Sequence, residues 1–449
     1  MNDTIVAIST AMGVGAISIV RLSGNDAIEI ANKCFKGKDL TKVNSHTINY
    51  GFIKDGDLII DEVLVSVMKA PKTFTAEDVV EINCHGGIIA TNKVLETCLN
   101  NGARLAEAGE FTKRAFLNGR IDLLESEAVM DIIDSKSEEA RKMAISQIKG
   151  NTSKLIEKFR DNLRNLLSSI EVNIDYPEYY DIEVVTIDKI KKEVKNMKKE
   201  LEELINESSN TMNIKNGIKT VIIGKPNVGK SSILNKLLQE EKAIVTDIAG
   251  TTRDIVEGQI YLDGILLNII DTAGIRNTED VVEKIGVNKS LSMIEEADLV
   301  IVVLNSNEEL TEEDIEILEK TKNKQRIIVL NKNDLENKIK LPTLDNVITT
   351  TTTNENGIIP LKNKIKELFN LEKIKTKDYT YLTNSRQISL AKQAYKSLID
   401  AENGVEIGSP IDMIEIDLKE CFDLLGEIIG ITYSDEIIDN LFRNFCVGK

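Results

Sequence analysis

A glycine-rich loop that ends in lysine and serine carries the clearest chemistry in the chain. Residues 224–231 read Gly-Lys-Pro-Asn-Val-Gly-Lys-Ser, which is the G-x-x-x-x-G-K-S pattern of a phosphate-binding loop. In such a loop, backbone N–H groups and the N-terminus of the following helix bind phosphate oxygens. We expect Lys230 to reach the β- and γ-phosphates of a nucleotide and the Ser231 hydroxyl to bind Mg²⁺.

Two stretches downstream have the composition of a metal shell and a switch loop. Asp271-Thr-Ala-Gly274 follows the apolar run 265–270, and an aspartate at the end of such a strand holds the Mg²⁺ shell. Thr251-Thr252 lies between this motif and the loop, where a switch loop places a hydroxyl on Mg²⁺. A chance glycine-rich turn at 224–231 is therefore a poor explanation.

A fourth motif predicts which base is bound. Asn331-Lys-Asn-Asp334 follows the apolar run 326–330. A carboxylate there accepts two hydrogen bonds from the Watson–Crick edge of guanine, whereas adenine presents an acceptor and leaves the carboxylate unpaired. Asp334 is therefore predicted to select GTP over ATP.

These motifs define the predicted nucleotide site, to which the family resemblance described below adds the threonine stretch 351–353. The predicted GTP-binding residues are Asn227, Val228, Gly229, Lys230, Ser231, Ser232, Thr246, Asp247, Ile248, Ala249, Gly250, Thr251, Thr252, Asp271, Thr272, Ala273, Gly274, Asn331, Lys332, Asn333, Asp334, Thr351, Thr352 and Thr353. The predicted Mg²⁺ ligands are Ser231 and Thr252.

The elements around these motifs divide the chain into four segments. Strand-like and helix-like patterns mix in the first, as in an α+β domain; the second and fourth are helical; and the third alternates strand and helix as a parallel sheet requires. We expect the helical segments to pack as one domain into which the nucleotide-binding domain is inserted. The four segments are 1–118, 119–213, 214–376 and 377–449.

Several details of the helical segments are also predicted. Residues 123–148 and 153–174 each have the periodicity of one amphipathic helix. Apolar residues spaced by three and four over 187–204 predict a bundle helix, and the polar stretch 206–211 predicts a linker after it. In the first segment, the two glycines of 85–87 could let backbone approach a ligand, although a plain strand-to-helix turn is the simpler interpretation.

Composition bounds the remaining possibilities. The 449 residues suffice for about three domains, and the formal net charge is −17. Five scattered cysteines without a C-x-x-C pair favour a reducing cytosol and argue against a zinc cluster. We see no signal peptide and no apolar run near the roughly 20 residues of a membrane span, so we expect a cytoplasmic protein. Because the chain is acidic, any contact with RNA requires a local basic patch or a partner.

Motifs near both ends complete a recognisable order. The N-terminal segment contains Ile19-Val-Arg-Leu-Ser-Gly24, His85-Gly-Gly87 and Gly109-Glu-Phe-Thr-Lys-Arg114, and the chain closes with Cys446-Val-Gly-Lys449. Together with the inserted GTPase motifs, this order resembles the MnmE (TrmE) family of tRNA modification GTPases, from about residue 3 to residue 449. The resemblance implies an N-terminal α+β folate-binding-like domain and an all-α domain with a Ras-like P-loop GTPase domain inserted into it.

The resemblance also implies a function. The family modifies carbon five of the wobble uridine in certain tRNAs, giving an aminomethyl or carboxymethylaminomethyl uridine. It works with the FAD-dependent protein MnmG (GidA), with which it forms a heterotetramer, and tRNA is bound through that complex. The N-terminal domain forms a homodimer and binds a 5-formyl-tetrahydrofolate-like one-carbon donor. GTP and GDP are the implied nucleotides, and no membrane partner is implied.

Four charged residues match the folate positions of the family. Arg21, Arg120 and Lys449 suit the glutamate carboxylates of folate, and Glu81 suits the pterin N–H groups. Arg120 stands where lysine is frequent, which changes the geometry of that contact. Taken singly, each of these residues would be better explained as a solvated surface charge. Cys446 is either a reactive thiol near the one-carbon unit or an apolar plug in the helical domain.

The hydrolytic machinery differs from that of Ras-like enzymes. They place Gln directly after the DTAG motif to orient the attacking water, and here that residue is Ile275. Glu283 matches the catalytic glutamate of the family, although an ordinary first-turn helix glutamate is the alternative. No arginine finger is evident, and the family implies K⁺ in its place. The implied K⁺ ligands are Asn227, Thr246, Ile248 and Thr251; simple capping of the loop by Asn227 is the alternative.

Two stretches depart from the family pattern. Thr351-Thr352 replaces the usual Ser-Ala of the guanine loop, and Thr10-Ala-Met-Gly13 replaces Thr-Pro-Pro-Gly, which removes rigidity from that turn.

Two other classes of GTPase are alternatives. A basic RNA-binding segment after the nucleotide-binding domain would favour a ribosome-assembly GTPase, but residues 379–449 are not strongly basic. A membrane-remodelling GTPase would need a basic or apolar lipid-binding surface, which the sequence does not show.

Overall fold

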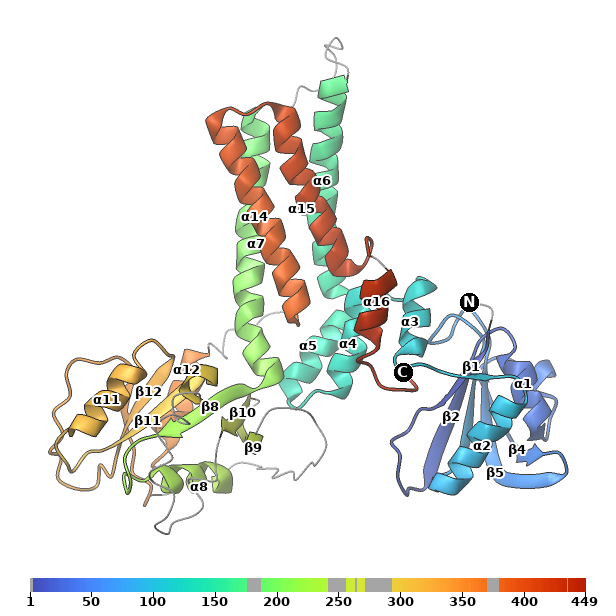
Figure 1. Cartoon of the computed structure of the whole chain (residues 1–449), viewed down its shortest axis with the longest axis horizontal. Helices are drawn as coiled ribbons and strands as arrows, with labels where there is room; N and C mark the ends of the chain where they lie inside the picture. Colours follow the sequence, from blue (N-terminus) through green and yellow to red (C-terminus); the bar gives the residue numbers. More distant parts are fainter. Residues whose placement is uncertain are drawn as a thin grey trace. The chain divides into compact units, whose positions relative to one another are not determined.

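The computed structural model forms two compact units (Figure 1). One contains Met1–Met130, Ile148–Val185 and Gly404–Lys449, and the other contains Asp131–Gln147 and Thr186–Asn403. The predicted four-segment division stays a prediction. The residues described are 3–175, 187–240, 256–262, 265–270, 293–354, 356–369, 379–433 and 435–449.

A seven-stranded sheet forms the core of the first unit. Its order is β3-β4-β5-β6-β2-β1-β7, and all neighbours are antiparallel except β1 and β7. Strands β4 and β5 form a hairpin, with Gly56 at φ 58° in its turn. The strands are β1 (Ile5–Ile8), β2 (Ile17–Ser23), β3 (Phe35–Lys36), β4 (Thr47–Asp55), β5 (Leu58–Met68), β6 (Val79–His85) and β7 (Arg104–Leu105).

The two faces of this sheet differ. Helices α1 (Ala27–Cys34) and α2 (Ile88–Asn100) share one apolar core with alternate strand residues, because side chains alternate between the faces of a strand. The alternate positions Ile48, Tyr50 and Leu64 are exposed. A short 3₁₀ turn, η1 (Leu40–Lys42), follows β3.

Four other helices of this unit pack in two pairs. Helix α6 (Asn151–Asp175) packs on α15 (Ile411–Ile429), and the Arg160 guanidinium lies 4.3 Å from the centre of the Phe422 ring. Helix α3 (Glu110–Leu117) packs on α16 (Asp435–Phe442), joined by an ion pair between Lys113 and Asp439. Helix α6 confirms the helix predicted at 153–174.

The single helix predicted at 123–148 is wrong. The structure has two helices there, α4 (Leu123–Ile133) and α5 (Glu138–Ile148). The Ser135 hydroxyl donates to the Asp131 carbonyl at the end of α4, and Ser137 Oγ accepts from the Ala140 N–H at the start of α5. These serines satisfy backbone groups at the break, which apolar periodicity alone does not reveal.

A six-stranded sheet forms the core of the second unit and confirms the predicted α/β nucleotide-binding domain. Its order is β13-β12-β11-β8-β10-β9, and only β9 is antiparallel to its neighbour. Helices α8 (Lys230–Glu240) and α12 (Ile359–Leu368) share one core, and α11 (Glu312–Lys320) belongs to the other. The strands are β8 (Ile218–Ile223), β9 (Val256–Leu262), β10 (Ile265–Ile270), β11 (Leu299–Asn305), β12 (Arg326–Asn331) and β13 (Val347–Thr349).

Helix α7 (Ile187–Asn216) leads directly into this sheet, so the linker predicted at 206–211 is wrong. The Ser209 and Thr211 hydroxyls donate to carbonyls four residues earlier, and Ser208 Oγ accepts from the Leu382 N–H. The polar residues therefore remain satisfied inside the helix. The predicted apolar seam is confirmed, because Ile190, Val194, Met197, Leu201 and Leu204 are buried.

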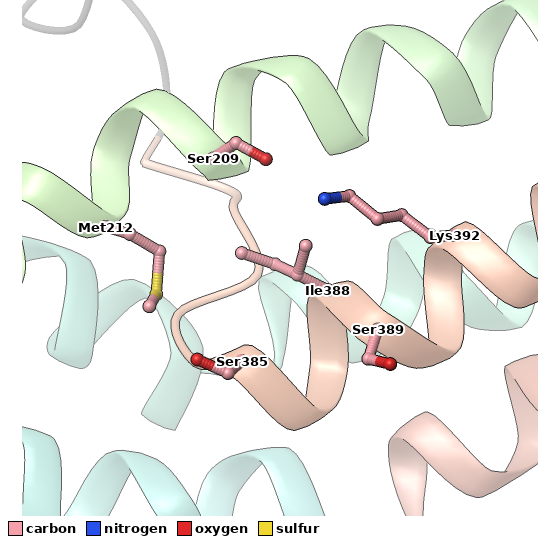
Figure 2. A pocket seen from close by; sticks show the side chains of 6 residues that line it. All are labelled: Ser209, Met212, Ser385, Ile388, Ser389 and Lys392. Atoms are coloured by element: carbon pink, nitrogen blue, oxygen red, sulfur yellow. The ribbon is translucent and has the colours of Figure 1, made fainter. Parts of the chain in front are cut away.

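A cavity of about 340 Å³ opens between α7 and α14 (Ser385–Ile407), as Figure 2 shows. Its lining residues are Ser209, Met212, Ser385, Ile388, Ser389 and Lys392. None of them belongs to a predicted site. Within the described ranges, every helix is too short or too polar to traverse a lipid bilayer.

Candidate functional site

The phosphate-binding loop lies between β8 and α8, and its glycines occupy positions that other residues do not fit. Gly224 has φ 152° and Gly229 has φ 103°, and Asn227 between them has φ 61°. A Cβ on Gly224 would lie 2.3 Å from the Val303 carbonyl oxygen, and one on Gly229 would lie 2.1 Å from Asn331 Nδ2. The glycine spacing of the motif thus follows from close packing as well as from backbone freedom.

Lys230 begins α8 and lies across this loop. Its ammonium donates hydrogen bonds to the carbonyl oxygens of Gly224 and Lys225, each at 2.7 Å. Ser231 is half-buried, and the adjacent Ser232 is exposed. The loop therefore collects a cation and two hydroxyls at the N-terminus of a helix, an arrangement that suits phosphate.

Asn331 joins three loops at one edge of the sheet. Its Nδ2 donates to the Val228 carbonyl at 2.9 Å, and its Oδ1 accepts from the Thr350 hydroxyl at 3.2 Å. Asn331 is only 1% exposed. Because β8, β12 and β13 run parallel, their carboxyl ends meet at the edge where α/β proteins bind ligands. The structure thus brings the phosphate-binding loop, the base-selecting motif and the threonine loop together.

The base-selecting motif presents its carboxylate to solvent. The Asp334 side chain is exposed and has no ion pair or hydrogen bond with any described residue. Lys332 has φ 62°, and the Asn333 N–H donates to the Thr350 carbonyl. Asp334 is therefore free to accept hydrogen bonds from a base.

The threonine loop is held by its own backbone. The Thr351 N–H donates to the Gly357 carbonyl at 3.2 Å. Thr351 and Thr352 are half-buried, whereas Thr353 is exposed. The loop therefore begins beside the Asn331 bridge.

The other predicted residues of the nucleotide site lie outside the described residues. Among them are a proposed Mg²⁺ ligand, three proposed K⁺ ligands and the proposed catalytic glutamate. They are Thr246, Asp247, Ile248, Ala249, Gly250, Thr251, Thr252, Asp271, Thr272, Ala273, Gly274 and Glu283.

One pair at the phosphate-binding loop was not predicted from the sequence. Lys225 Nζ lies 2.8 Å from Asp314 Oδ2, and the two side chains are 13% and 4% exposed. The same carboxylate oxygen accepts from the N–H and hydroxyl of Thr311, which caps α11. Thr311-x-x-Asp314 is a recognisable capping box, but nothing in the sequence links it to a variable position of the loop.

In the first unit, three of the four predicted folate residues lie together. Arg21 and Glu81 face each other on β2 and β6, with Arg21 Nε 2.8 Å from Glu81 Oε1. The Arg21 guanidinium also donates to the Gly448 carbonyl at 3.0 Å, next to the C-terminal Lys449. Ser9 donates its hydroxyl to the same carbonyl. Residues from both ends of the chain thus form one cluster.

The charges of this cluster favour an anionic ligand. Partial burial lowers the pKa of Lys449, and the like charge of Arg21 lowers it further, against the opposing effect of Glu81. Arg21 and Lys449 are two cations beside the one side-chain carboxylate of Glu81, and either cation can pair with a ligand carboxylate. The chemistry of folate fits these donors.

Two other residues that the family resemblance singled out are Arg120 and Cys446. Arg120 lies over the Phe74 ring at 5.1 Å and makes no ion pair or hydrogen bond with Arg21, Glu81 or Lys449 in the described structure. Cys446 is exposed, so the interpretation as an apolar plug is wrong.

The first glycine of the His85-Gly86-Gly87 stretch serves local packing. A Cβ on Gly86 would lie 2.5 Å from the Gly15 carbonyl oxygen, and the Gly15 N–H donates to the Gly86 carbonyl. His85 Nδ1 lies 2.7 Å from Asp61 Oδ1, which raises the pKa of the imidazole. The close backbone approach is therefore within the chain, at the turn before α2.

Comparison with known proteins decides the family. A model of the MnmE helical domain matches residues 123–446, and one of the GTP-binding protein TrmE N-terminus matches residues 4–120. The tRNA modification GTPase MnmE of Bacillus cytotoxicus is 52% identical, with 100% of this chain and 99% of the relative covered. The chain belongs to the MnmE family.

Two further MnmE proteins give the same match. That of Staphylococcus aureus is 52% identical over 100% of this chain and 99% of its own, and that of Bacillus velezensis is 51% identical over 100% of both. The solved G domain of the T. maritima FeoB iron transporter covers 34% of this chain at 24% identity with a TM-score of 0.23. That score is too low to carry an argument. As an MnmE family member with a P-loop domain, the chain is a GTPase.

Proposed function

We propose that this chain is the GTP-hydrolysing subunit of a complex that installs an aminomethyl or carboxymethylaminomethyl group at carbon five of the wobble uridine in tRNA. The one-carbon unit comes from a tetrahydrofolate, and the partner is an FAD-dependent MnmG (GidA)-like protein in a heterotetramer. Membership of the MnmE family over the whole chain supports the proposal. It also disfavours a ribosome-assembly GTPase without modification chemistry.

The observation that carries the proposal is the cluster of Arg21, Glu81 and Lys449. None of these three residues belongs to the nucleotide-binding motifs, so nucleotide binding does not account for the cluster. The C-terminal lysine is held beside the Arg21–Glu81 pair through the Gly448 carbonyl, which suits a ligand with carboxylates and N–H donors. In this proposal Arg120 joins the ligand from the side of Phe74.

The nucleotide site does its work through position and charge. Lys230 and the loop N–H groups bind the phosphates, and Asp334 holds guanine. Ser231 and Thr252 would hold Mg²⁺, which neutralises phosphate charge when bound. Glu283 orients the attacking water, because Ile275 cannot.

Hydrolysis is proposed to use K⁺ held by Asn227, Thr246, Ile248 and Thr251. Asn227 is exposed in a left-handed conformation at the loop, so its side chain is available to a ligand. We expect faster steady-state hydrolysis in KCl than in NaCl at equal ionic strength. An arginine finger accelerates hydrolysis roughly 10³- to 10⁵-fold in other GTPases, and K⁺ in its place should have an effect of comparable size. Equal rates in the two salts, or an Asn227→Ala variant that K⁺ still stimulates fully, would refute this role.

A homodimer through the N-terminal domain is part of the proposal. The exposed Ile48, Tyr50 and Leu64 give one sheet face an apolar surface that a second copy would cover.

The function is tested by mass spectrometry of wobble nucleosides from cells that lack the chain. The C5-modified uridines should disappear and return when the unaltered chain is supplied. Glu336→Gln, an exposed change outside the predicted sites, serves as a complementing control. Unchanged nucleosides in the deletion strain would overturn the function.

A further inference from the structure

Helix α7 carries its charges in two opposed blocks. Residues 188–199 contain six lysines against two acidic residues, a net charge of +4, whereas residues 200–207 contain four glutamates and no basic residue, a net charge of −4. The helix dipole favours anions toward the N-terminus and cations toward the C-terminus, so this order opposes it. Helix stability therefore does not explain the arrangement.

Three of these lysines form a stripe on one side of the helix. Lys192, Lys195 and Lys199 are spaced by three and four residues, which places them on the same face. All three are exposed, and none has an ion pair or hydrogen bond with another described residue. We call these residues the lysine stripe. Its charge is available to an external partner.

The other side of the same segment is fixed. Ile190, Val194 and Met197 are at most 4% exposed. Lys198 pairs with Glu402 on α14, and this pairing raises the pKa of Lys198. The buried face therefore fixes the orientation of α7, so that the lysine stripe points to solvent. The apolar face cannot become exposed unless the helix separates from its neighbours.

The chemistry of the exposed face separates the possible partners. Between the stripe lysines the exposed positions carry Asn196 and no apolar side chain. A helix that inserts into a lipid surface needs apolar residues on its free face, and a protein interface needs an apolar or aromatic centre. Binding to the phosphate backbone of a nucleic acid requires only exposed cations, and lysine binds phosphate as a point charge.

We propose that the lysine stripe binds the phosphate backbone of RNA. The stripe is about 10 Å long at 1.5 Å per residue, which allows contact with successive phosphates of one strand. It supplies a local positive field on a chain whose net charge is −17. The identification of that RNA as tRNA rests on the proposed function.

The test compares full-length variants in binding to an unmodified tRNA transcript. Lys192→Gln/Lys195→Gln/Lys199→Gln removes the charges and keeps side-chain length and helix propensity. The matched control is Lys33→Gln/Lys36→Gln/Lys38→Gln, three exposed lysines without described partners in the first unit. Affinity is measured by fluorescence anisotropy between about 50 and 200 mM KCl, because each phosphate contact contributes roughly 0.7 to 0.9 to the salt slope.

The stripe variant should bind more weakly at every salt concentration, and its slope of log affinity against log salt should be shallower by about two. The control should match the unaltered chain, and both variants should retain GTP hydrolysis and thermal stability. An unchanged slope in the stripe variant, or no tRNA binding by the unaltered chain, would overturn the proposal. So would stripe-dependent binding to phosphatidylglycerol vesicles without an effect on tRNA.

These outcomes are separate from those of the proposed function. A stripe variant with normal tRNA affinity overturns the stripe, while loss of the C5-modified uridine in the deletion strain still supports the function. A shallower slope together with unchanged nucleosides in the deletion strain supports RNA binding and overturns the modification function.

Discussion

Asp334 is the residue on which base selection depends. Asp334→Asn presents an amide where guanine requires two accepted hydrogen bonds, and it should favour xanthine nucleotide. Hydrogen bonds to charged groups contribute about 1.5 to 3 kcal/mol each, so we expect kcat/KM for GTP to fall on the order of 10²-fold. Steady-state hydrolysis of GTP and XTP measures this, with Glu336→Gln as the control. Unchanged efficiency with GTP would show the assignment to be wrong.

His85 offers a titration at the same scale. Asp61 raises its pKa above the ordinary value of about 6.5, chiefly by a hydrogen bond to the ring. The contribution of this pair to stability is therefore complete below that ordinary value and is lost as the pH rises through the raised pKa. The chain has two histidines, so NMR with His46→Gln assigns the signals. Asp61→Asn should lower the pKa of His85; an unaltered titration curve would contradict the pairing.

At the scale of elements, Asp314 connects α11 to the phosphate-binding loop. Asp314→Asn leaves the Lys225 ammonium without its buried partner, and we expect the free energy of unfolding to fall by about 1 to 3 kcal/mol. GTP affinity should fall as well, because the loop loses its attachment. Denaturant unfolding and nucleotide titration measure both effects, and Glu316→Gln on the exposed side of α11 is the control.

A double variant tests whether any loss of stability comes from the unpaired Lys225 ammonium. Adding Lys225→Met to Asp314→Asn should restore most of the lost stability, because it removes the unpaired buried ammonium while the asparagine oxygen can still accept from Thr311. If Asp314→Asn alone leaves both unfolding and GTP affinity unchanged, the pair does not position the loop.

The limits of sequence-based prediction also lie at this scale. The parallel sheet of the nucleotide-binding domain and the strand–loop–helix context of its phosphate-binding loop followed from apolar runs and motif spacing, whereas the order of the strands did not. The break between α4 and α5 did not, since Ser135 and Ser137 satisfy the backbone there without interrupting the apolar period. Residues 206–211 read as a linker because serine and threonine are weak helix formers, yet their hydroxyls bond back to the helix.

The two candidate sites were predicted to different depths. Asn331 was placed correctly by its motif, but its bridge to Val228 and Thr350 depends on strands far apart in sequence. The contact of Arg21 with the Gly448 carbonyl joins opposite ends of the chain, and only the family resemblance had linked them. The partnership of Lys225 and Asp314 had no sequence signal at all.

At the scale of the whole molecule, the C-terminus should matter for modification and not for hydrolysis. Residues 446–449 lie against β1 and β2, where the carbonyl of Gly448 accepts from Ser9 and Arg21. Deleting them should abolish tRNA modification while GTP hydrolysis persists. Wobble-nucleoside analysis of the complemented deletion strain and a phosphate-release assay measure the two activities. Normal modification by the truncated chain would rule out its role in the folate cluster.

The central claim is that GTP hydrolysis by this chain drives uridine modification. It is tested most directly by reconstitution of the chain with its FAD-dependent partner, unmodified tRNA and a tetrahydrofolate one-carbon donor. The mass of the wobble nucleoside is then determined with GTP, with GDP and with a non-hydrolysable GTP analogue. We predict the C5-modified uridine with GTP alone, and equal modification with GDP or the analogue would contradict the claim.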